Sequence, residues 1–385
     1  MASLVILNPQ FSILNSALLA VWLLILANTI LSIVFAPRLR SSILNPQSSI
    51  RVSALVPARD EERRIERTVR ALLAQTYPNF EIIVVNDRST DATGAILEAI
   101  DDPRLRVITG EEPPPGWLGK PWALHQASQH ARGELLLFLD ADIHYEPGAI
   151  AAAVARIQQS GVAMISLLPR IEMEGFWEHI AMPNLAMMVF CAMPLWLANR
   201  VRSPLLAAGG GPGNLVWRDD YDAAGGHEAL QAAVVDDVAL ARLVRRSGRR
   251  TEMVLADDFV SVRMYHGLRE TIEGFTKNTF TVFGRSYIAT VLIVILSIVL
   301  HVLPYVFALF GNLRAIAAVV ALTLSRVLLF AFLGYRIDNA LFGHVPMVLL
   351  WDVIFLRSAW ITGVRRQLHW RGRRYDASRT RFGAD

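Results

Sequence analysis

The sequence predicts an α/β domain with a mostly parallel central sheet covered by helices on both faces, joined to membrane helices at both ends of the chain. Short apolar runs alternate with helical segments between about residues 51 and 140, a pattern typical of parallel strands covered by helices. Long apolar stretches lie at residues 12–36 and again after residue 285. The 385 residues are 53% hydrophobic and 19% charged, which is too apolar for an ordinary soluble protein.

The first apolar stretch, residues 12–36, is long enough to cross a bilayer core of about 30 Å. A cleaved signal peptide needs basic residues before its apolar part, but no Lys or Arg precedes Arg38. We therefore expect residues 1–37 to be an uncleaved anchor. Arg38, Arg40 and Arg51 follow it, so the positive-inside rule predicts an outside N-terminus and a cytoplasmic domain after the anchor.

Strands and helices alternate in the middle of the chain. The expected strands are residues 51–57, 81–86, 105–109 and 134–139. The expected helices are about 60–75, 91–101 and 120–132. Acidic side chains suit a helix N-terminus, so Asp60, Glu61 and Glu62 are expected to open the first helix, and Ser89 or Thr90 to cap the second.

Two carboxylates close the last of these strands, in the sequence Asp140-Ala141-Asp142. At the C-terminal end of such a strand they project into the crevice where open α/β sheets bind ligands. Carboxylate oxygens suit Mg²⁺ or Mn²⁺, and these ions usually complete their shell with water and substrate phosphates. The motif alone also fits a capped turn; together with the motifs below it predicts a site for a metal-bound diphosphate.

Two further apolar stretches, at about 287–310 and 315–335, predict a transmembrane hairpin within residues 285–336 that turns at Gly311-Asn312. Arg326 lies at the middle of the second stretch, so we expect it to face other helices or a polar cavity.

The C-terminal region, residues 337–385, contains an apolar segment at 345–363 that includes Asp352 and Arg357. If it crossed the membrane, the basic tail from Arg365 to Arg374 would lie outside, against the positive-inside rule. We expect a re-entrant or interfacial helix there, with the tail in the cytoplasm.

Charge and cysteine content argue against several kinds of partner and site. The net charge is +4 and the arginines gather near the apolar segments, which indicates attraction to anionic lipid head groups and not to nucleic acid. The single cysteine, Cys191, excludes an intrachain disulfide and any multi-cysteine metal site, and it is typical of a protein in a reducing cytosol.

Three motifs together resemble, in order and spacing, the inverting family 2 glycosyltransferases of the GT-A fold. They are Val56-Pro57-Ala58-Arg59-Asp60-Glu61-Glu62, Val84-Val85-Asn86-Asp87-Arg88-Ser89-Thr90-Asp91 and Asp140-Ala141-Asp142. The resemblance extends from about residue 51 to 285 and implies a cytoplasmic glycosyltransferase domain at residues 38–284. With its membrane segments, the chain resembles the hopene-associated and carotenoid-type bacterial lipid glycosyltransferases, which implies a multi-pass protein of the inner (plasma) membrane.

The resemblance assigns the donor site. Asp60, Glu61 and Asp87 occupy positions that contact the nucleotide base and ribose, and a carboxylate can accept from either group; for Asp60 and Glu61 the alternative is helix capping alone. Lys120, near a helix N-terminus, is expected at the diphosphate, against the alternative of a solvated lysine. The whole predicted donor-binding set is Pro57, Ala58, Asp60, Glu61, Asp87, Lys120, Asp140 and Ala141.

The same resemblance implies a divalent metal, Mn²⁺ or Mg²⁺, held by Asp140 and Asp142, with Asp142 as the firmer ligand. The metal would neutralise charge that builds on the leaving nucleoside diphosphate. His266 is a candidate third ligand, with a structural surface histidine as the alternative.

The catalytic carboxylates are expected at Val235-Asp236-Asp237-Val238, which resembles the family's Glu-Asp helix start. Asp237 matches the general base, which removes the proton of the acceptor hydroxyl as its oxygen attacks. Asp236 stands where the family often has Glu, and we expect it near the acceptor but replaceable. The alternative is that both acids only favour a helix N-terminus. The glycine-rich residues 209–214 lack the context of a dinucleotide fingerprint and correspond to the family's acceptor side.

Residues 175–200 are apolar but interrupted by Pro183 and Pro194. They predict either a buried helix of the catalytic domain or, as we favour, an interfacial helix beside the acceptor site. No Arg-Trp pair follows the predicted base, and this departure from the processive members favours transfer of a single sugar.

The expected function is transfer from a nucleotide-diphosphate sugar, with UDP favoured over GDP, to a hydroxyl or carboxyl of a membrane lipid in the bilayer. The alternatives are a polyprenyl-phosphate sugar synthase and a non-catalytic sugar-nucleotide-binding membrane protein. Retention of Asp87, Asp140, Asp142 and Asp237 speaks against the non-catalytic protein.

Overall fold

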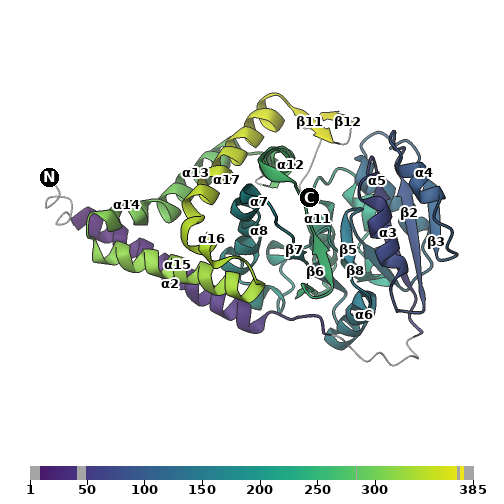
Figure 1. Cartoon of the computed structure of the whole chain (residues 1–385), viewed down its shortest axis with the longest axis horizontal. Coiled ribbons are helices and arrows are strands. Elements are labelled where there is room, and N and C mark those ends of the chain that lie inside the picture. Colours follow the sequence, from purple (N-terminus) through teal and green to yellow (C-terminus); the bar gives the residue numbers. More distant parts are fainter. Residues whose placement is uncertain (1–8, 41–48, 283, 371–372, 377–385) are drawn as a thin grey trace. The chain divides into compact units, whose positions relative to one another are not determined.

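The computed structural model describes residues 9–40, 49–282, 284–370 and 373–376, and these form two compact units (Figure 1). The helical unit comprises Met1–Phe35, Met173–Trp196 and Tyr265–Leu368. The sheet unit comprises Ala36–Glu172, Leu197–Met264 and His369–Asp385. The structure thus groups Met173–Trp196 and Tyr265–Leu368 with the predicted membrane helices.

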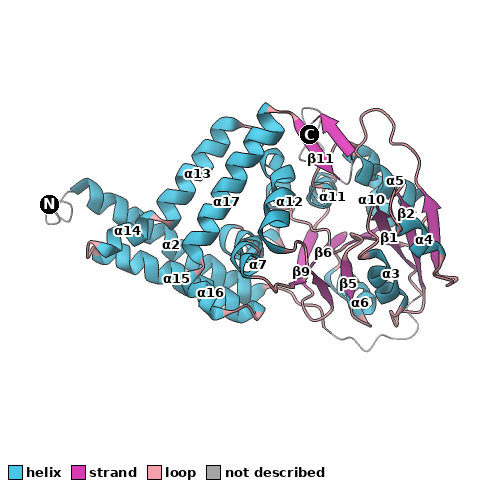
Figure 2. Cartoon of the chain, turned by 45° about the horizontal axis from the view of Figure 1, so that its top comes forward, coloured by secondary structure: helices cyan, strands magenta, loops and turns pink. Residues whose placement is uncertain are grey.

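The sheet unit is built on a seven-stranded sheet in the order β3-β2-β1-β4-β8-β6-β9 (Figure 2). Its strands are β1 Val52–Ala58, β2 Phe80–Asn86, β3 Leu105–Thr109, β4 Leu135–Phe138, β6 Met164–Leu168, β8 Asn214–Trp217 and β9 Thr251–Leu255. Strand β8 runs antiparallel to β4 and β6, and the other neighbours are parallel. The mostly parallel sheet predicted from the sequence is confirmed.

Two smaller sheets complete the strands. One contains β5 Ile143–Tyr145, β10 Val260–Val262 and β7 Arg170–Ile171. The other pairs β11 Gln367–Trp370 with β12 Arg373–Asp376. The predicted basic tail overlaps this pair, and its residues 371 and 372 lie outside the described residues.

Helices cover both faces of the large sheet. Helices α3 (Ile65–Leu73) and α6 (Ala149–Ser160) pack on one face, where they bury Ala54 of β1. Helices α5 (Gly119–His130) and α11 (Asp236–Arg246) pack on the other, where they bury Leu55. Successive strand residues point to opposite faces, so burial on both sides explains the continuous apolar runs in the sequence. The remaining helices of this unit are α4 Thr93–Glu98, α10 Arg218–Ala223 and the short 3₁₀ segments η2 Pro204–Leu206 and η3 Gly226–Leu230.

Two predicted helix starts are wrong. Helix α3 begins at Ile65, after a turn, and α4 begins at Thr93 with Ala92 at its N-cap and no side-chain cap. Ser89 Oγ instead accepts from the backbone N–H of Asp60, and the N–H of Thr90 donates to the Asp60 carboxylate. The polar side chains that were expected to cap α4 therefore join the loops after β1 and β2.

The strand register brings the ends of several strands to one edge of the sheet. Val56 of β1 lies opposite Val84 of β2, and Leu55 lies opposite Phe138 at the end of β4. Because β8 runs the other way, its first residue, Asn214, pairs with Phe138 at the same edge. The residues that follow β1, β2 and β4 and those that precede β8 therefore meet there.

The helical unit contains four helices that are long and apolar enough to cross a membrane, by length and composition, among the described residues. They are Ser12–Phe35, Tyr287–Leu309, Leu313–Leu333 and His344–Val364. The first three match the predicted spans, and Gly311, with φ of 76°, lies in the predicted turn. The fourth falls on the segment expected to be re-entrant or interfacial, and that arrangement stays a prediction.

The structure divides these spans further. The second consists of α13 (Tyr287–His301) and α14 (Leu303–Leu309), and Pro304 at the break accounts for the interruption, because proline cannot donate to the helix ladder. The others are α2 Pro9–Phe35, α15 Leu313–Leu333 and α17 His344–Ser358, which is continued by a π-helical turn, Ala359–Val364. Helix α12 (Gly267–Val282) and α13 both pack on α17 (Figure 2).

Arg326 faces other helices, as predicted. It is 1% exposed, and its guanidinium donates to the carbonyls of Asn339 at 2.8 Å and Ala340 at 3.0 Å. Both carbonyls lie in the short helix α16 (Ile337–Phe342), so the arginine ties α15 to the segment before α17.

Residues 175–200 form a broken series of short helices within the helical unit up to Trp196. They are α7 Phe176–Ala181, α8 Pro183–Met187, a π turn Met188–Ala192 and α9 Leu195–Ala198. The Asn28 side chain of α2 donates to the carbonyl of Cys191 at 2.9 Å, and Trp351 of α17 donates to the carbonyl of Ala181 at 3.0 Å. The part up to Trp196 packs against candidate membrane helices and is not a helix buried in the sheet unit.

Candidate active site

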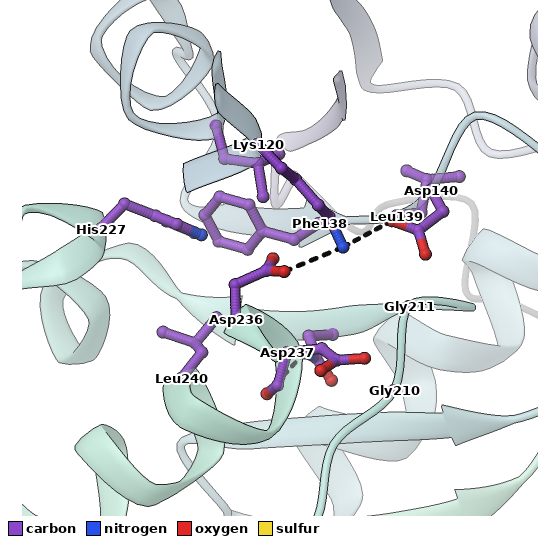
Figure 3. A pocket seen from close by; sticks show the side chains of 12 residues that line it. Lys120, Phe138, Leu139, Asp140, Gly210, Gly211, His227, Asp236, Asp237 and Leu240 are labelled. Carbon is purple, nitrogen blue, oxygen red and sulfur yellow. Dashed lines mark hydrogen bonds and ion pairs between the residues drawn. The ribbon is translucent and has the colours of Figure 1, made fainter. Parts of the chain in front are cut away.

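A pocket opens at the sheet edge where β4 ends and β8 begins (Figure 3). It brings together four predicted site residues, Lys120, Asp140, Asp236 and Asp237, from α5, the end of β4 and the first turn of α11. The remaining lining residues are Leu124, Phe138, Leu139, Gly210, Gly211, Asn214, His227 and Leu240.

Lys120 lies between two of these carboxylates. Its Nζ is 2.7 Å from Asp140 Oδ1 and 3.0 Å from Asp236 Oδ1, and Figure 3 shows the nitrogen joined to both. Burial alone would lower the pKa of Lys120, but the charges of Asp140, Asp236 and Asp237 outweigh it and hold that pKa well above its ordinary value. The alternative of a solvated lysine is therefore wrong.

The two acids that open α11 have different surroundings. Asp236 is 4% exposed and paired with Lys120; burial raises its pKa to about 6, although the lysine opposes the shift. Asp237 is half-buried, and its carboxylate accepts from the N–H of Val238 at 2.8 Å and from the N–H of Gly211. Burial also raises the pKa of Asp237. Asp237 is thus the carboxylate better placed to receive a proton, whereas Asp236 is a buried ion-pair partner, an environment that does not favour the replaceability we expected.

His227 was not among the predicted site residues. It is 1% exposed, and its Nδ1 lies 2.9 Å from the hydroxyl of Tyr221. Burial and the charge of Lys120 lower the pKa of His227 to about 3, so the ring is neutral at pH 7. Sequence reasoning also missed Phe138, Leu139 and Leu240, because apolar residues that line a pocket look like any other core residues in the sequence.

The predicted base and ribose contacts lie on the loops after β1 and β2. The N–H of Asp87 donates to the carbonyl of Ala58 at 2.8 Å, so these two predicted residues are neighbours. Asp60 adopts a left-handed φ of 51°, a conformation that aspartate tolerates better than most residues, and accepts from the N–H of Thr90 at 2.8 Å.

The other predicted donor residues are placed by the same elements. Pro57 lies in β1 opposite Val85, and the N–H of Glu61 donates to Thr93 Oγ1 at 2.8 Å. Ala141 is buried, and its carbonyl accepts from Thr68 of α3. The residues lining the described pocket include none of the predicted base and ribose contacts.

The carboxylates at the end of β4 are suitable ligands for a divalent metal whose coordination shell is completed by substrate. Asp140 reaches the pocket with its side chain 36% exposed, while Asp142 Oδ2 lies 3.2 Å from Arg64 Nη1. Among the described residues no group of three or more His, Cys, Asp or Glu side chains could hold a metal. One or two carboxylates plus substrate phosphates is nevertheless the usual arrangement for Mg²⁺. His266 lies in the helical unit, where its N–H donates to Glu270, and its role as a ligand stays a prediction.

Comparison with known proteins identifies one domain of this chain. Residues 53–200 match the model of glycosyl transferase family 2. The chain carries a family 2 glycosyltransferase domain. The enzyme class predicted from the sequence, a glycosyltransferase, is thereby confirmed.

Relatives named as glycosyltransferases match most of the chain. The glycosyltransferase is similar to 4,4'-diaponeurosporenoate glycosyltransferase of Staphylococcus aureus strain USA300, with 25% identity over 343 residues that cover 85% of this chain and 89% of the relative. The corresponding protein of strain MRSA252 is 24% identical over the same coverage. The structure of mannosyltransferase PcManGT from Pyrobaculum calidifontis, in complex with GDP-Man and Mn²⁺, covers 91% of this chain and 96% of its own at 19% identity and a TM-score of 0.56, which confirms the predicted fold.

Gly211 leaves the space that the Asp140 carboxylate occupies. A Cβ added there would overlap the Asp140 carboxylate. We expect Gly211→Ala to displace that carboxylate from Lys120 and to lower turnover by about 100-fold, the scale of a 1 Å misplacement in a catalytic site. Steady-state kinetics of the purified variant check this expectation.

The neighbouring Gly210→Ala is a matched control, because a Cβ there meets only Pro212, at 3.2 Å. It should keep turnover within a few-fold of the wild type. If both alanine variants kept turnover close to that of the wild type, the position of Asp140 would not matter for the reaction.

Proposed function

We propose that this glycosyltransferase moves one sugar from a nucleotide-diphosphate sugar to a membrane lipid, with inversion at the anomeric carbon. The observation that carries the proposal is the half-buried Asp237, which lines one pocket with Asp140 at the carboxyl edge of the sheet. Two observations support a lipid acceptor: the four candidate membrane helices among the described residues, and a relative named as a 4,4'-diaponeurosporenoate glycosyltransferase.

In the proposed reaction Asp237 is the general base. The acceptor hydroxyl gives its proton to the Asp237 carboxylate, and its oxygen forms a bond to the anomeric carbon from the face opposite the diphosphate. The bond from that carbon to the diphosphate breaks on the other side, so a single displacement inverts the centre. An ionised carboxyl acceptor would arrive without this proton and would not need the base.

The donor side is assigned to the loops after β1, β2 and β4. Asp60, Glu61 and Asp87 would hold the nucleoside, and Lys120 and Asp140 would lie beside the diphosphate as it leaves the sugar. A divalent metal held by Asp140 and Asp142, when bound, would act as a Lewis acid on the leaving diphosphate; the PcManGT complex with Mn²⁺ supports this assignment.

We also propose that the protein lies in the plasma membrane with its sheet unit in the cytoplasm. Arg38, Arg40 and Arg51 follow the first candidate span, which supports this orientation by the positive-inside rule. Nucleotide sugars are then available to the sheet unit, and a lipid acceptor is available at the bilayer surface.

Nucleoside diphosphate release by the detergent-purified protein tests the proposal. A panel of UDP- and GDP-sugars is offered with Mn²⁺ or with EDTA, and with or without a bacterial lipid extract. We expect release from one donor class, at least tenfold faster with lipid and abolished by EDTA. Release that is unchanged by lipid would contradict the lipid acceptor, and release that survives EDTA would contradict the metal.

A further inference from the structure

The glycine-rich loop before β8, together with the start of β8, contacts both the backbone and the carboxylate of Asp237. The side-chain Nδ2 of Asn214 donates to the Asp237 carbonyl at 3.2 Å. The N–H of Gly211 donates to the Asp237 carboxylate. A Cβ on Gly209 would overlap the Asp237 carbonyl, so the loop and the start of α11 are in direct contact. Gly209 and Gly211 of this loop, and Asn214 at the start of β8, therefore all contact Asp237 or leave room for it.

The same loop also touches Asp140. The N–H of Asp140 donates to the carbonyl of Gly211 at 2.9 Å, and the glycine leaves room for the Asp140 carboxylate. The loop is also held by Tyr145 of β5, whose hydroxyl donates to the carbonyl of Pro212 at 2.7 Å. Gly211 thus donates its N–H to the carboxylate of the proposed base, and its C=O accepts from the backbone N–H of Asp140.

Asn214, the first residue of β8, donates its side-chain amide to the first turn of α11. It is 1% exposed and lies in the sheet, paired with Phe138 of β4 and with Ser166 of β6. The Asp237 carbonyl can only accept, so the bond determines which end of the Asn214 amide faces it. A residue held by two strands is a rigid support for the first turn of a helix.

We propose that Asn214 is a positioning residue for the transfer step. By holding the backbone of Asp237 against the glycine loop, it keeps the Asp237 carboxylate at the pocket, beside Asp140. The proposal rests on the proposed role of Asp237 as general base. Asn214 lines the pocket, but in this proposal its effect on the reaction is exerted through Asp237 and not through contact with donor or acceptor.

Kinetics of Asn214→Ala and Asn214→Asp in the full-length, detergent-purified protein test this role. Alanine removes the donor, and aspartate keeps the shape of the side chain but cannot donate when ionised. We expect kcat to fall about 10- to 100-fold in both, the scale of a small misplacement of a catalytic group. The donor KM and the affinity for the nucleoside diphosphate should stay within about twofold.

Ser166→Ala is the matched control. Ser166 is 1% exposed, lies opposite Asn214 and donates to the carbonyl of Ala208, at the start of the same loop, without a described contact to Asp237. It should keep kcat close to wild type. If Ser166→Ala lost as much kcat as Asn214→Ala, or if Asn214→Ala kept wild-type kcat, the positioning role would be wrong.

A double-mutant cycle with Asp237→Asn separates this proposal from the proposed function. If Asn214 acts through Asp237, then Asn214→Ala should cause no further loss in the Asp237→Asn background. Losses that multiply would contradict the positioning role while leaving the base in place. An Asp237→Asn variant that turns over at the wild-type rate would instead contradict the base itself, and the role of Asn214 with it.

Discussion

Replacement of Asp237 by asparagine is expected to lower transfer to a hydroxyl acceptor by about 10²- to 10⁴-fold, the usual contribution of a general base. The amide has the size of the carboxylate and can still accept from the N–H groups of Val238 and Gly211, so the local structure should persist. It cannot take up the acceptor proton. The loss should appear in kcat at saturating donor, with little change in donor KM.

Asp236→Asn is the informative comparison. Asp236 pairs with Lys120, so its loss should reduce stability and should change donor KM as well as kcat. A wild-type rate for Asp237→Asn would contradict the base, unless the isolated product is a sugar ester of an ionised carboxyl acceptor, which needs no proton removal. The chemical class of the product therefore decides how that result is interpreted.

Replacement of Lys120 by methionine is expected to lower the free energy of unfolding by about 3–5 kcal/mol, the usual cost of removing one partner of a buried ion pair. Methionine keeps most of the volume but leaves Asp140 and the buried Asp236 without their shared cation. Turnover should fall as well, because both carboxylates line the pocket. Unfolding followed in detergent, together with kinetics of the same preparations, measures both effects.

The double variant Lys120→Met and Asp236→Asn tests the electrostatic explanation. With the carboxylate neutralised, less charge is left buried without a partner, so the double variant should be more stable than the sum of the two single losses predicts. Strictly additive losses would show that Lys120 stabilises the fold through its packing and not through its charge.

The fold was predictable where it depends on the pattern of apolar residues within one segment of the sequence. Apolar strands that alternate with helices gave the parallel sheet, and the long uncharged stretches gave three of the candidate spans at nearly their observed limits. The caps of α4 were not predictable in this way, because Ser89 and Thr90 bind residues of the loop after β1. A contact between two loops leaves no periodic signal in the sequence.

The candidate site was predictable where charge marks it. Lys120, Asp140, Asp236 and Asp237 were all selected from the sequence, and the fold brings them to one pocket. Their pairing was not evident, since nothing in the sequence shows that Lys120 lies between Asp140 and Asp236. His227 was missed as a site residue, and Asn214 was included only within the glycine-rich residues 209–214, because a neutral polar side chain acquires a role only from its neighbours in space.

The most direct test of the central claim is to follow the sugar itself. Sugar-labelled UDP and GDP donors are incubated with membranes that contain the wild-type protein or Asp237→Asn, and the label in the organic extract is measured. The account predicts that label from one donor enters a lipid product in wild-type membranes and that the variant strongly reduces it. Label that never leaves the aqueous phase, although the nucleoside diphosphate is released, would contradict a lipid acceptor.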